Sequence, residues 1–316
     1  MADGPGVKDG LDIVAIGEAM VEFNQARSDD PRTWLQGFGG DTSNTVIAAA
    51  RLGARSGYVS RVGSDAFGRR LLELWKDEGV DTTGVAVDGE APTGIYFVSH
   101  DARGHEFSYL RSGSAASRLA PSSLPLPVIA SARVLHLSAI SQAISASACD
   151  ACFAAIDAAR SAGLRIAYDT NLRLKLWPLA RARAIIFASM RVADWALPSL
   201  DDARILFDTD DPSRIVDECH ALGAPTVIVK LGPDGCLVSD GVRREHLRGK
   251  RVDAIDATGA GDCFDGAFLT RIVAGDDPFV AARYANVAAA LTTLGYGAVA
   301  PLPKAADVAR LLEAGR

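Results

Sequence analysis

The sequence lacks several features that would assign the protein to a class at once. No G-x-x-x-x-G-K-[ST] loop occurs in its 316 residues, which excludes a Walker A nucleotide site. The N-terminus, MADGPGVKDG, has neither the basic start nor the apolar run of a signal peptide, and no later segment offers about 20 uninterrupted apolar residues for a membrane span. We therefore expect a cytoplasmic protein without a membrane partner, in which residues 1–10 form a flexible tail.

An excess of positive charge is also absent. The net charge of -6 and the isoelectric point of about 5.4 argue against a general nucleic-acid surface. Cysteine and histidine are scarce, with five of each, and the odd, scattered cysteines suit a reducing compartment better than a disulfide framework. Cys149 and Cys152 lie in an amphipathic stretch, 145–163, so packed thiols are favoured there over a zinc or redox site.

Apolar residues are plentiful, at 48% of the chain with a mean hydropathy of +0.12, which is enough for a large core. Strands alternate with helices of 10–18 residues, and this order predicts an α/β fold with a parallel sheet covered on both faces. The predicted strands are 12–17, 132–138, 164–170, 195–197 and 226–232. The predicted helices include 42–53, 67–79, 145–163, 178–190, 199–207, 213–223 and 278–295.

One segment interrupts this alternation of strands and helices. Residues 93–113 contain two aromatic-rich strands on either side of a turn at 101–104, which is the pattern of a hairpin. Gly84 and Pro92 precede the hairpin, so we expect it to leave the main sheet and form a cover or lid.

The stretch DATGAGDCFDGAFL, 256–269, places glycines before an apolar helix that we expect to begin near Asp262. The preceding KRVDAIDA, 250–257, alternates like the end of a strand. Phe264 replaces the third glycine of G-x-G-x-x-G, which argues against a dinucleotide site. Amides at a helix N-terminus bind anions, and the same field would hold Asp262 ionised as a proton acceptor. Alternatively, Asp262 only caps the helix, with Asp265 completing a capping box.

A second glycine turn precedes a helix in the stretch 37–68. Gly39 and Gly40 would allow close approach of a small ligand, and Asp41 and Asn44 supply polar groups able to bind sugar hydroxyls. Taken alone, a glycine pair is weak evidence, and an asparagine at this place is more often a helix cap.

Together the two glycine turns resemble the paired signatures of the PfkB family of carbohydrate kinases, relatives of ribokinase. G-G-x-x-x-N begins at Gly39, G-x-D-x-F-G follows at 63–68, and G-A-G-D comes near the C-terminal quarter. The resemblance spans 11–313. It implies a ribokinase-like fold, a doubly wound and mostly parallel α/β domain over 11–316, with a small β lid formed by about 18–36 and 90–113.

The resemblance also implies roles for individual residues. Asp262 would be the catalytic base, and the anion hole for the γ-phosphate of ATP would consist of the amides of Gly259, Ala260 and Gly261. The residues expected to bind the nucleotide are Asn171, Lys230, Gly232, Gly235 and Asn286. For Lys230, a solvated strand end is an equal alternative.

Two metal ions are expected on the same basis. Mg²⁺ is needed because the charge of the transferred phosphate must be neutralised. The family often carries N-x-x-E for the magnesium shell, whereas this chain reads SLDD at 199–202, where Asp202 could act through a water molecule. Asp256 and Thr258 match positions that bind a monovalent cation in some relatives, which makes K⁺ a candidate.

Two arginines indicate an acidic sugar. Arg111 ends a lid strand beside Tyr96 and Tyr109, and Arg173 follows a core strand at the carboxyl edge where ligands bind in such sheets. An arginine fork suits a carboxylate, and each charge-assisted bond contributes about 1.5–3 kcal/mol. Alternatively, Arg111 is solvated and Arg173 contacts only the phosphates of ATP.

The phrases YLRSGSAAS, DTNLRLKLW and GGDTSN resemble the 2-keto-3-deoxygluconate kinase branch of the family more than ribokinases or fructokinases. That branch transfers the γ-phosphate of ATP to the terminal hydroxyl of the sugar acid, giving 2-keto-3-deoxy-6-phosphogluconate in an Entner–Doudoroff type pathway. In this interpretation the substrate is held by Gly39, Gly40, Asn44, Tyr96, Tyr109, Arg111 and Arg173.

The sequence leaves three alternatives: a kinase of a neutral sugar such as fructose or ribose, a dinucleotide-dependent oxidoreductase and a non-catalytic sugar-binding regulator. We expect a homo-oligomer, with a dimer favoured.

Overall fold

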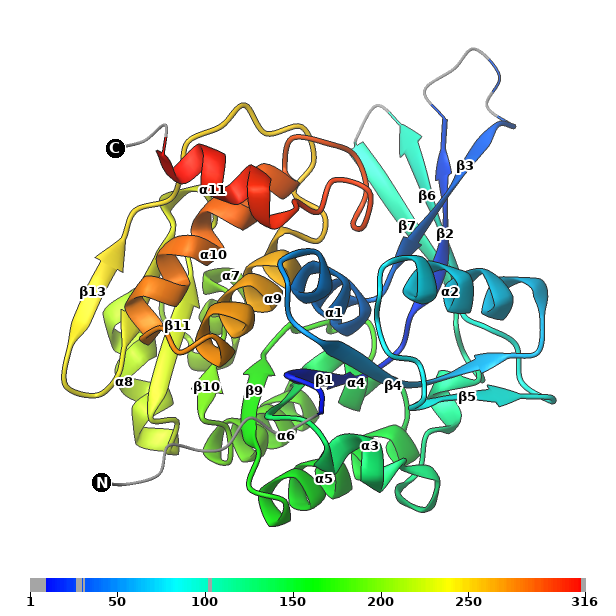
Figure 1. Ribbon diagram of the computed structural model, residues 1–316, viewed down its shortest axis with the longest axis horizontal. Coiled ribbons are helices and arrows are strands. Elements are labelled where there is room, and N and C mark those ends of the chain that lie inside the picture. Colours follow the sequence, from blue (N-terminus) through cyan, green and yellow to red (C-terminus); the bar gives the residue numbers. More distant parts are fainter. Residues whose placement is uncertain (1–9, 27–29, 31, 102–103, 314–316) are drawn as a thin grey trace.

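The computed structural model describes residues 10–26, 30, 32–101 and 104–313, and its main domain is built on a nine-stranded sheet (Figure 1). The strand order is β13-β12-β11-β10-β9-β8-β1-β4-β5. β12 and β13 pair antiparallel at one edge, and the other seven strands pair parallel. The prediction of a mostly parallel α/β sheet is therefore confirmed. The strands are β1 (Ile13–Ile16), β4 (Ser56–Gly63), β5 (Val85–Asp88), β8 (Val134–Ser138), β9 (Arg165–Asp169), β10 (Trp195–Ala196), β11 (Thr226–Lys230), β12 (Cys236–Ser239) and β13 (Arg244–Leu247).

Helices cover both faces of this sheet, because its central strands are apolar on both sides. In β1, Ile13 and Ala15 belong to one core cluster, whereas Val14 and Ile16 belong to the other. The first face packs against α1 (Asp41–Arg51), α2 (Ala66–Asp77), α9 (Ala260–Val273), α10 (Pro278–Thr292) and α11 (Ala305–Glu313). The second packs against α3 (Leu126–Ala130), α4 (Ala139–Ala143), α5 (Ala146–Ser161), α6 (Leu179–Arg191), α7 (Leu200–Phe207) and α8 (Pro212–Leu222).

A separate four-stranded sheet projects from the main domain and forms the predicted lid (Figure 1). Its order is β3-β2-β6-β7, with the strands β2 (Met20–Gln25), β3 (Trp34–Gly39), β6 (Ile95–Asp101) and β7 (Gly104–Leu110). β6 and β7 pair antiparallel with Ile95 opposite Leu110, which confirms the predicted hairpin. The predicted turn residues 102–103 and the predicted tail residues 1–9 lie outside the described part of the chain.

The predicted strand end at 250–257 is wrong. β13 ends at Leu247, and the chain then runs as a loop until α9 begins at Ala260. β12 and β13, which the sequence did not indicate, explain the difference. Because β13 is the last strand of the sheet, the following residues have no described neighbour strand to pair with, and they cross over the sheet edge towards α9.

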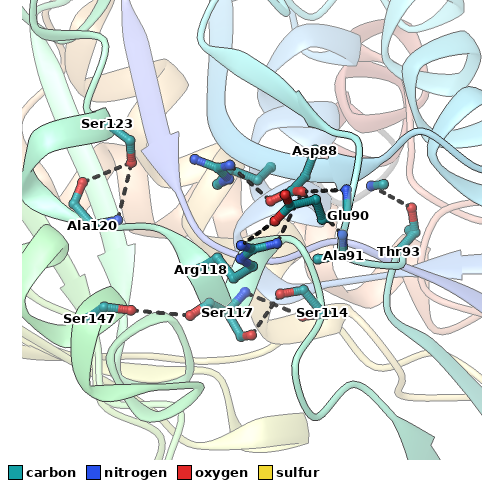
Figure 2. Close-up of polar contacts among 12 residues, drawn as sticks. Asp88, Glu90, Ala91, Thr93, Ser114, Ser117, Arg118, Ala120, Ser123 and Ser147 are labelled. Carbon is teal, nitrogen blue, oxygen red and sulfur yellow. Dashed lines mark hydrogen bonds and ion pairs between the residues drawn. The ribbon is translucent and has the colours of Figure 1, made fainter.

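The lid is joined to the main domain through a polar network centred on Asp88, the last residue of β5 (Figure 2). One carboxylate oxygen of Asp88 accepts from the amides of Glu90 and Ala91, at 2.9 and 3.1 Å. Arg118, which follows the lid, pairs with Asp88 at 3.2 Å and with Glu90 at 2.9 Å. These hydrogen bonds and the Arg61 guanidinium hold the pKa of Asp88 at about 2, so its charge persists at physiological pH. The network therefore ties the entry and the exit of the β6–β7 hairpin together.

All five cysteines are buried thiols without a disulfide, as the packing interpretation of Cys149 and Cys152 predicts. Burial raises the pKa of the Cys152 thiol, which disfavours the reactive thiolate.

None of the helices in the described residues combines the length and the apolarity that a membrane crossing needs.

Candidate active site

A cavity of about 760 Å³ opens at the carboxyl end of β11, between the loop before α9 and the helices α9 and α10. Of the residues predicted to bind the nucleotide, four line it: Lys230, Gly232, Gly235 and Asn286. The fifth, Asn171, lies outside this cavity, because its side-chain amide donates to Asp41 at 3.2 Å on the opposite side of the site. The volume falls in the range of small-molecule pockets, which is about 300–1,000 Å³.

The first turn of α9 forms one wall of this cavity. Gly259 is the N-cap with φ of 76°, a conformation that favours glycine, and α9 begins at Ala260. The amide of Ala260 already donates to the carbonyl oxygen of Ala257 at 3.2 Å, so this member of the predicted anion hole has a partner within the chain. Gly261 has an open side towards Lys230, since a Cβ atom there would lie 3.7 Å from the lysine Nζ. Ala260 and Gly261 line the cavity and, because the Ala260 amide is engaged, Gly261 is the lining residue of the predicted anion hole that is left to meet an anion.

Close packing of α1 against α9 brings Asn44 to Asp262. A Cβ atom at Gly266 would lie 2.5 Å from the carbonyl oxygen of Thr45, so this approach requires glycine. Asn44 Nδ2 donates to Asp262 Oδ2 at 2.8 Å. Both capping interpretations are therefore wrong: α9 has no side-chain cap, and Asn44 lies inside α1 behind the N-cap Gly40.

The carboxyl of Asp262 is more basic than the sequence suggests. Burial and the neighbouring Asp41 carboxylate raise the pKa of Asp262 to about 7, and Asp169 acts in the same direction. The Asn44 hydrogen bond and the Lys230 charge oppose this increase without cancelling it. Asp262 is therefore more basic than the helix N-terminus alone would make it, since burial outweighs a helix-terminus contribution of about 0.3–1 kcal/mol. A group that titrates near neutral pH is well suited to accept a proton.

A buried ionic triad lies beneath the first turn of α9. Lys230 Nζ is 3.1 Å from a carboxylate oxygen of Asp169 and 3.1 Å from one of Asp265. The side chain of Asp265 is fully buried, and that of Lys230 is 11% exposed. The alternative of a solvated Lys230 is therefore wrong, and Asp265 binds Lys230 instead of completing a capping box.

Unpartnered acceptor oxygens lie beside Asp262 on the side away from the nucleotide cavity. Asp41 Oδ2 accepts from the hydroxyl of Ser138 and from the amide of Asn171. Asp41 Oδ1 and Asn44 Oδ1 are buried and have no hydrogen-bond partner among the described residues. Buried acceptors are nearly always paired in proteins, so these two indicate a place for a ligand that donates hydrogen bonds.

The lid contributes two buried carboxylates that the sequence interpretation left without a role. Glu18 accepts from Arg111 Nε at 2.8 Å, and Glu22 accepts from the hydroxyl of Tyr96. Glu18 and Glu22 are only 2% and 4% exposed. The interpretation of Arg111 as a solvated residue is therefore wrong. A Cβ atom at Gly39 would lie 2.3 Å from the Tyr96 hydroxyl, so this glycine makes room for the lid tyrosine rather than only for a ligand.

Tyr109 links the two arginines that were predicted to bind an acidic group. The guanidinium carbon of Arg111 lies 5.9 Å from the centre of the Tyr109 ring. The charges of Arg173 and Arg111 both act on the Tyr109 hydroxyl, although burial still raises its pKa. Arg173 Nη1 donates to the carbonyl oxygen of Leu172 at 2.8 Å, and its guanidinium has no further hydrogen-bond partner among the described residues. Both guanidinium groups are therefore near enough to Tyr109 for their charges to act on its hydroxyl.

The predicted metal ligands lie apart from one another. Asp202 accepts from the Thr170 hydroxyl at 3.3 Å, and burial, with Asp169 nearby, raises its pKa. Asp256 accepts from the amide and the hydroxyl of Thr258, at 2.9 and 2.6 Å, and from the amide of Gly297 at 2.9 Å. The described residues contain no group of three or more His, Cys, Asp or Glu side chains that could hold a metal ion by itself.

Comparison with known proteins identifies the family. The profile of the pfkB family carbohydrate kinases matches residues 11–305. The chain is 35% identical to 2-dehydro-3-deoxygluconokinase from Thermoproteus tenax, over 96% of this chain and 95% of that protein. It is also 35% identical to fructokinase-2 from Solanum habrochaites, over 96% of each chain. A ribokinase II from E. coli, solved with ATP and Mg²⁺, has a TM-score of 0.89 and 25% identity over 96% of this chain and 99% of that one. The protein therefore belongs to the pfkB family of carbohydrate kinases.

Family membership makes the protein a phosphotransferase with a ribokinase-like fold, and it removes the basis for the oxidoreductase alternative. Sequence reasoning missed three carboxylates of the site, Glu18, Glu22 and Asp169. It also assigned Asp265 to a capping box instead of to the ion pair with Lys230. The available signal was position, because Glu18 and Asp169 both follow or end a buried strand on the ligand-binding edge.

Proposed function

We propose that the protein is a cytoplasmic, ATP-dependent kinase of 2-keto-3-deoxygluconate that phosphorylates its terminal hydroxyl. The observation that carries the proposal is the pair Arg111 and Arg173, whose positive charges both act on the hydroxyl of Tyr109 in the lid. A sugar acid would place its carboxylate at the arginines and its far hydroxyl at Asp262. The similarity to 2-dehydro-3-deoxygluconokinase supports this choice, although the similarity to fructokinase-2 is of the same degree.

In this proposal each residue has a defined task. Asp262 accepts the proton of the sugar hydroxyl, while Asn44 fixes the orientation of its carboxylate. The free acceptor oxygens of Asp41 and Asn44 receive hydrogen bonds from other hydroxyls of the sugar. The first turn of α9, with the amide of Gly261, stabilises the charge on the transferred phosphoryl group.

The nucleotide-side cavity fits ATP in size and in chemistry. Apolar side chains and the Asn286 amide suit a base, and the glycine turn at 232–235 allows a phosphate chain to approach the backbone. Mg²⁺ is bound with few protein ligands in such enzymes, so the absence of a three-carboxylate group among the described residues agrees with it. Asp202 would hold the ion through water, and the bound ion would neutralise part of the triphosphate charge.

A neutral sugar is the second candidate, because Glu18 already neutralises Arg111 in the structure. With this pairing only Arg173 keeps a full charge for a substrate carboxylate. A fructokinase or ribokinase activity would then need no acid-binding pair. The close similarity to fructokinase-2 agrees with this alternative.

One assay separates the two candidates. We would measure ADP release with 2-keto-3-deoxygluconate, its galacto epimer, gluconate, fructose and ribose at equal concentrations. We expect kcat/KM for 2-keto-3-deoxygluconate to exceed that for fructose by about 100-fold, because a neutral sugar offers no carboxylate for the Arg173 guanidinium to bind. A higher kcat/KM with fructose or ribose would refute the sugar-acid proposal and leave the kinase assignment intact.

Two further properties follow as proposals. Leu35 and Leu110 on the lid are 62% and 64% exposed. We propose that these two leucines contact a second copy of the chain in a homodimer. Light scattering would test this. We propose K⁺ as an activator near Asp256 and Thr258, because the hydrogen bonds from Thr258 hold the Asp256 carboxylate in the loop before α9. Equal activity in K⁺ and Na⁺ would refute that role.

A further inference from the structure

Lys230, Asp169 and Asp265 meet at the boundary between the two halves of the site. Lys230 ends β11 and Asp169 ends β9, so the lysine side chain reaches across the end of β10, which lies between these strands. Asp265 approaches from α9, one turn after Asp262. The ammonium group therefore lies where the nucleotide cavity gives way to the region of Asp262 and Asp41.

The ammonium of Lys230 is held on one side and open on the other. Asp265 offers both oxygens to Nζ, at 3.1 and 3.2 Å, and Asp169 offers one at 3.1 Å. Nζ donates two hydrogen bonds to Asp265 and forms an ion pair with Asp169, so its third N–H, next to Asp169, is the donor that a ligand in the cavity can share. Lys230 lines the cavity, and the open side of Gly261 faces its Nζ.

We propose that Asp265 is a positioning residue for phosphoryl transfer: with Asp169 it fixes the Lys230 ammonium against the first turn of α9, so that the remaining N–H meets the transferred phosphoryl group. The inference rests on the proposed kinase reaction but not on the identity of the sugar. Asp265 itself does not touch either ligand, because its side chain is fully buried.

Electrostatics agree with this arrangement. A lysine has a flexible stem of four carbons, and fixing it in advance removes an entropic cost from the reaction. Burial and the neighbouring Asp169 carboxylate raise the pKa of Asp265, whereas the charge of Lys230 holds the pKa of Asp169 down. The charge of Lys230 therefore favours the ionised form of both carboxyls, which ties the three side chains into one cluster.

The test is a double-mutant cycle between Asp265 and Lys230, measured with whichever sugar of the panel gives the highest turnover. We expect Asp265→Ala to lower kcat about 10- to 100-fold with KM for the sugar changed less than about 3-fold. Asp265→Asn, which keeps the shape and an oxygen for Lys230, should recover most of kcat. In a Lys230→Met background, Asp265→Ala should have no further effect on kcat.

Thermal unfolding separates this role from a purely structural one. Lys230→Met should lower Tm because it leaves buried carboxyls without a cation, and the added Asp265→Ala should restore part of that loss without restoring kcat. Asp194→Asn is the matched control. Asp194 immediately precedes β10, at the amino end of the strand and away from the site, and its carboxylate pairs with Arg160. Its loss should lower Tm with kcat unchanged.

Two results would overturn the proposal. One is a normal kcat for the Asp265→Ala enzyme. The other is a decrease in kcat of the double variant equal to the product of the two single decreases, which would show that Asp265 acts independently of Lys230. Neither result depends on which sugar is phosphorylated, so failure here is distinguishable from failure of the sugar-acid proposal.

Discussion

The nucleotide side and the sugar side of the site differ in how they meet their ligands. The proposed nucleotide side is a preformed cavity with mostly apolar walls, which Lys230 and Asn286 line. The sugar side consists of charged groups that are paired with one another, such as Arg111 with Glu18. Binding on the first side mainly buries surface, whereas binding on the second must exchange ion pairs. We therefore expect the sugar side to set selectivity and the nucleotide side to tolerate change.

The largest effect is expected at Asp262, where the two sides meet. Asp262→Asn keeps the shape and the contact with Asn44 but cannot accept a proton. We expect kcat to fall about 10²- to 10⁴-fold, with ligand affinities changed little. Steady-state kinetics and calorimetric binding of both ligands would check this. An enzyme with nearly normal turnover would reduce Asp262 to a structural residue.

An intermediate effect is expected on the sugar side. Arg111→Ala removes one arm of the proposed carboxylate site, and about 1.5–3 kcal/mol corresponds to a 10- to 150-fold increase in KM for the sugar acid. KM for ATP should change less than 2-fold or so, since the lid residue lies outside the nucleotide cavity.

The control for Arg111 concerns its partner. Removing the arginine leaves Glu18 buried and unpaired, which destabilises the fold. The double variant Arg111→Ala with Glu18→Gln should therefore regain Tm while KM for the acid stays high. Equal increases in KM for both substrates would contradict the assignment of Arg111.

The smallest effect is expected on the nucleotide side. The Asn286 amide donates to the carbonyl oxygen of Leu247 at 3.1 Å, so Asn286→Leu removes a hydrogen bond that shapes the cavity wall. A loss of about 0.5–1.5 kcal/mol corresponds to a 2- to 12-fold increase in KM for ATP. KM for the sugar serves as the internal control and should not change. A larger effect on the sugar than on ATP would contradict the placement of the nucleotide.

The same contrast explains what the sequence could predict. The parallel sheet and the lid hairpin follow from patterns within single elements, such as the apolar runs of β1 and β8 and the aromatic strands around 101–104. The nucleotide-side residues follow from short motifs that one turn presents together, such as the glycines after β11. Single strands, helices and turns can be predicted because the residues that determine them are contiguous in the sequence.

The pairings on the sugar side could not be predicted, because each joins residues far apart in the chain. Arg111 finds Glu18 from 93 positions away, and Asn44 finds Asp262 from 218. The basicity of Asp262 has the same origin, since its pKa depends on Asp41 and on burial by other elements and not on its own helix. β12 and β13 were missed because strands of four residues carry little periodicity.

The most direct test of the account is the pH dependence of kcat/KM for the sugar at saturating nucleotide. Because Asp262 must be ionised to accept a proton and its pKa is about 7, kcat/KM should rise with pH to a plateau, with a midpoint near 7. Asp41→Asn should move this midpoint to lower pH, because it removes a neighbouring negative charge, and Asp262→Asn should abolish this limb. A wild-type midpoint near the ordinary aspartate value of about 4, or a limb that survives in Asp262→Asn, would contradict the account.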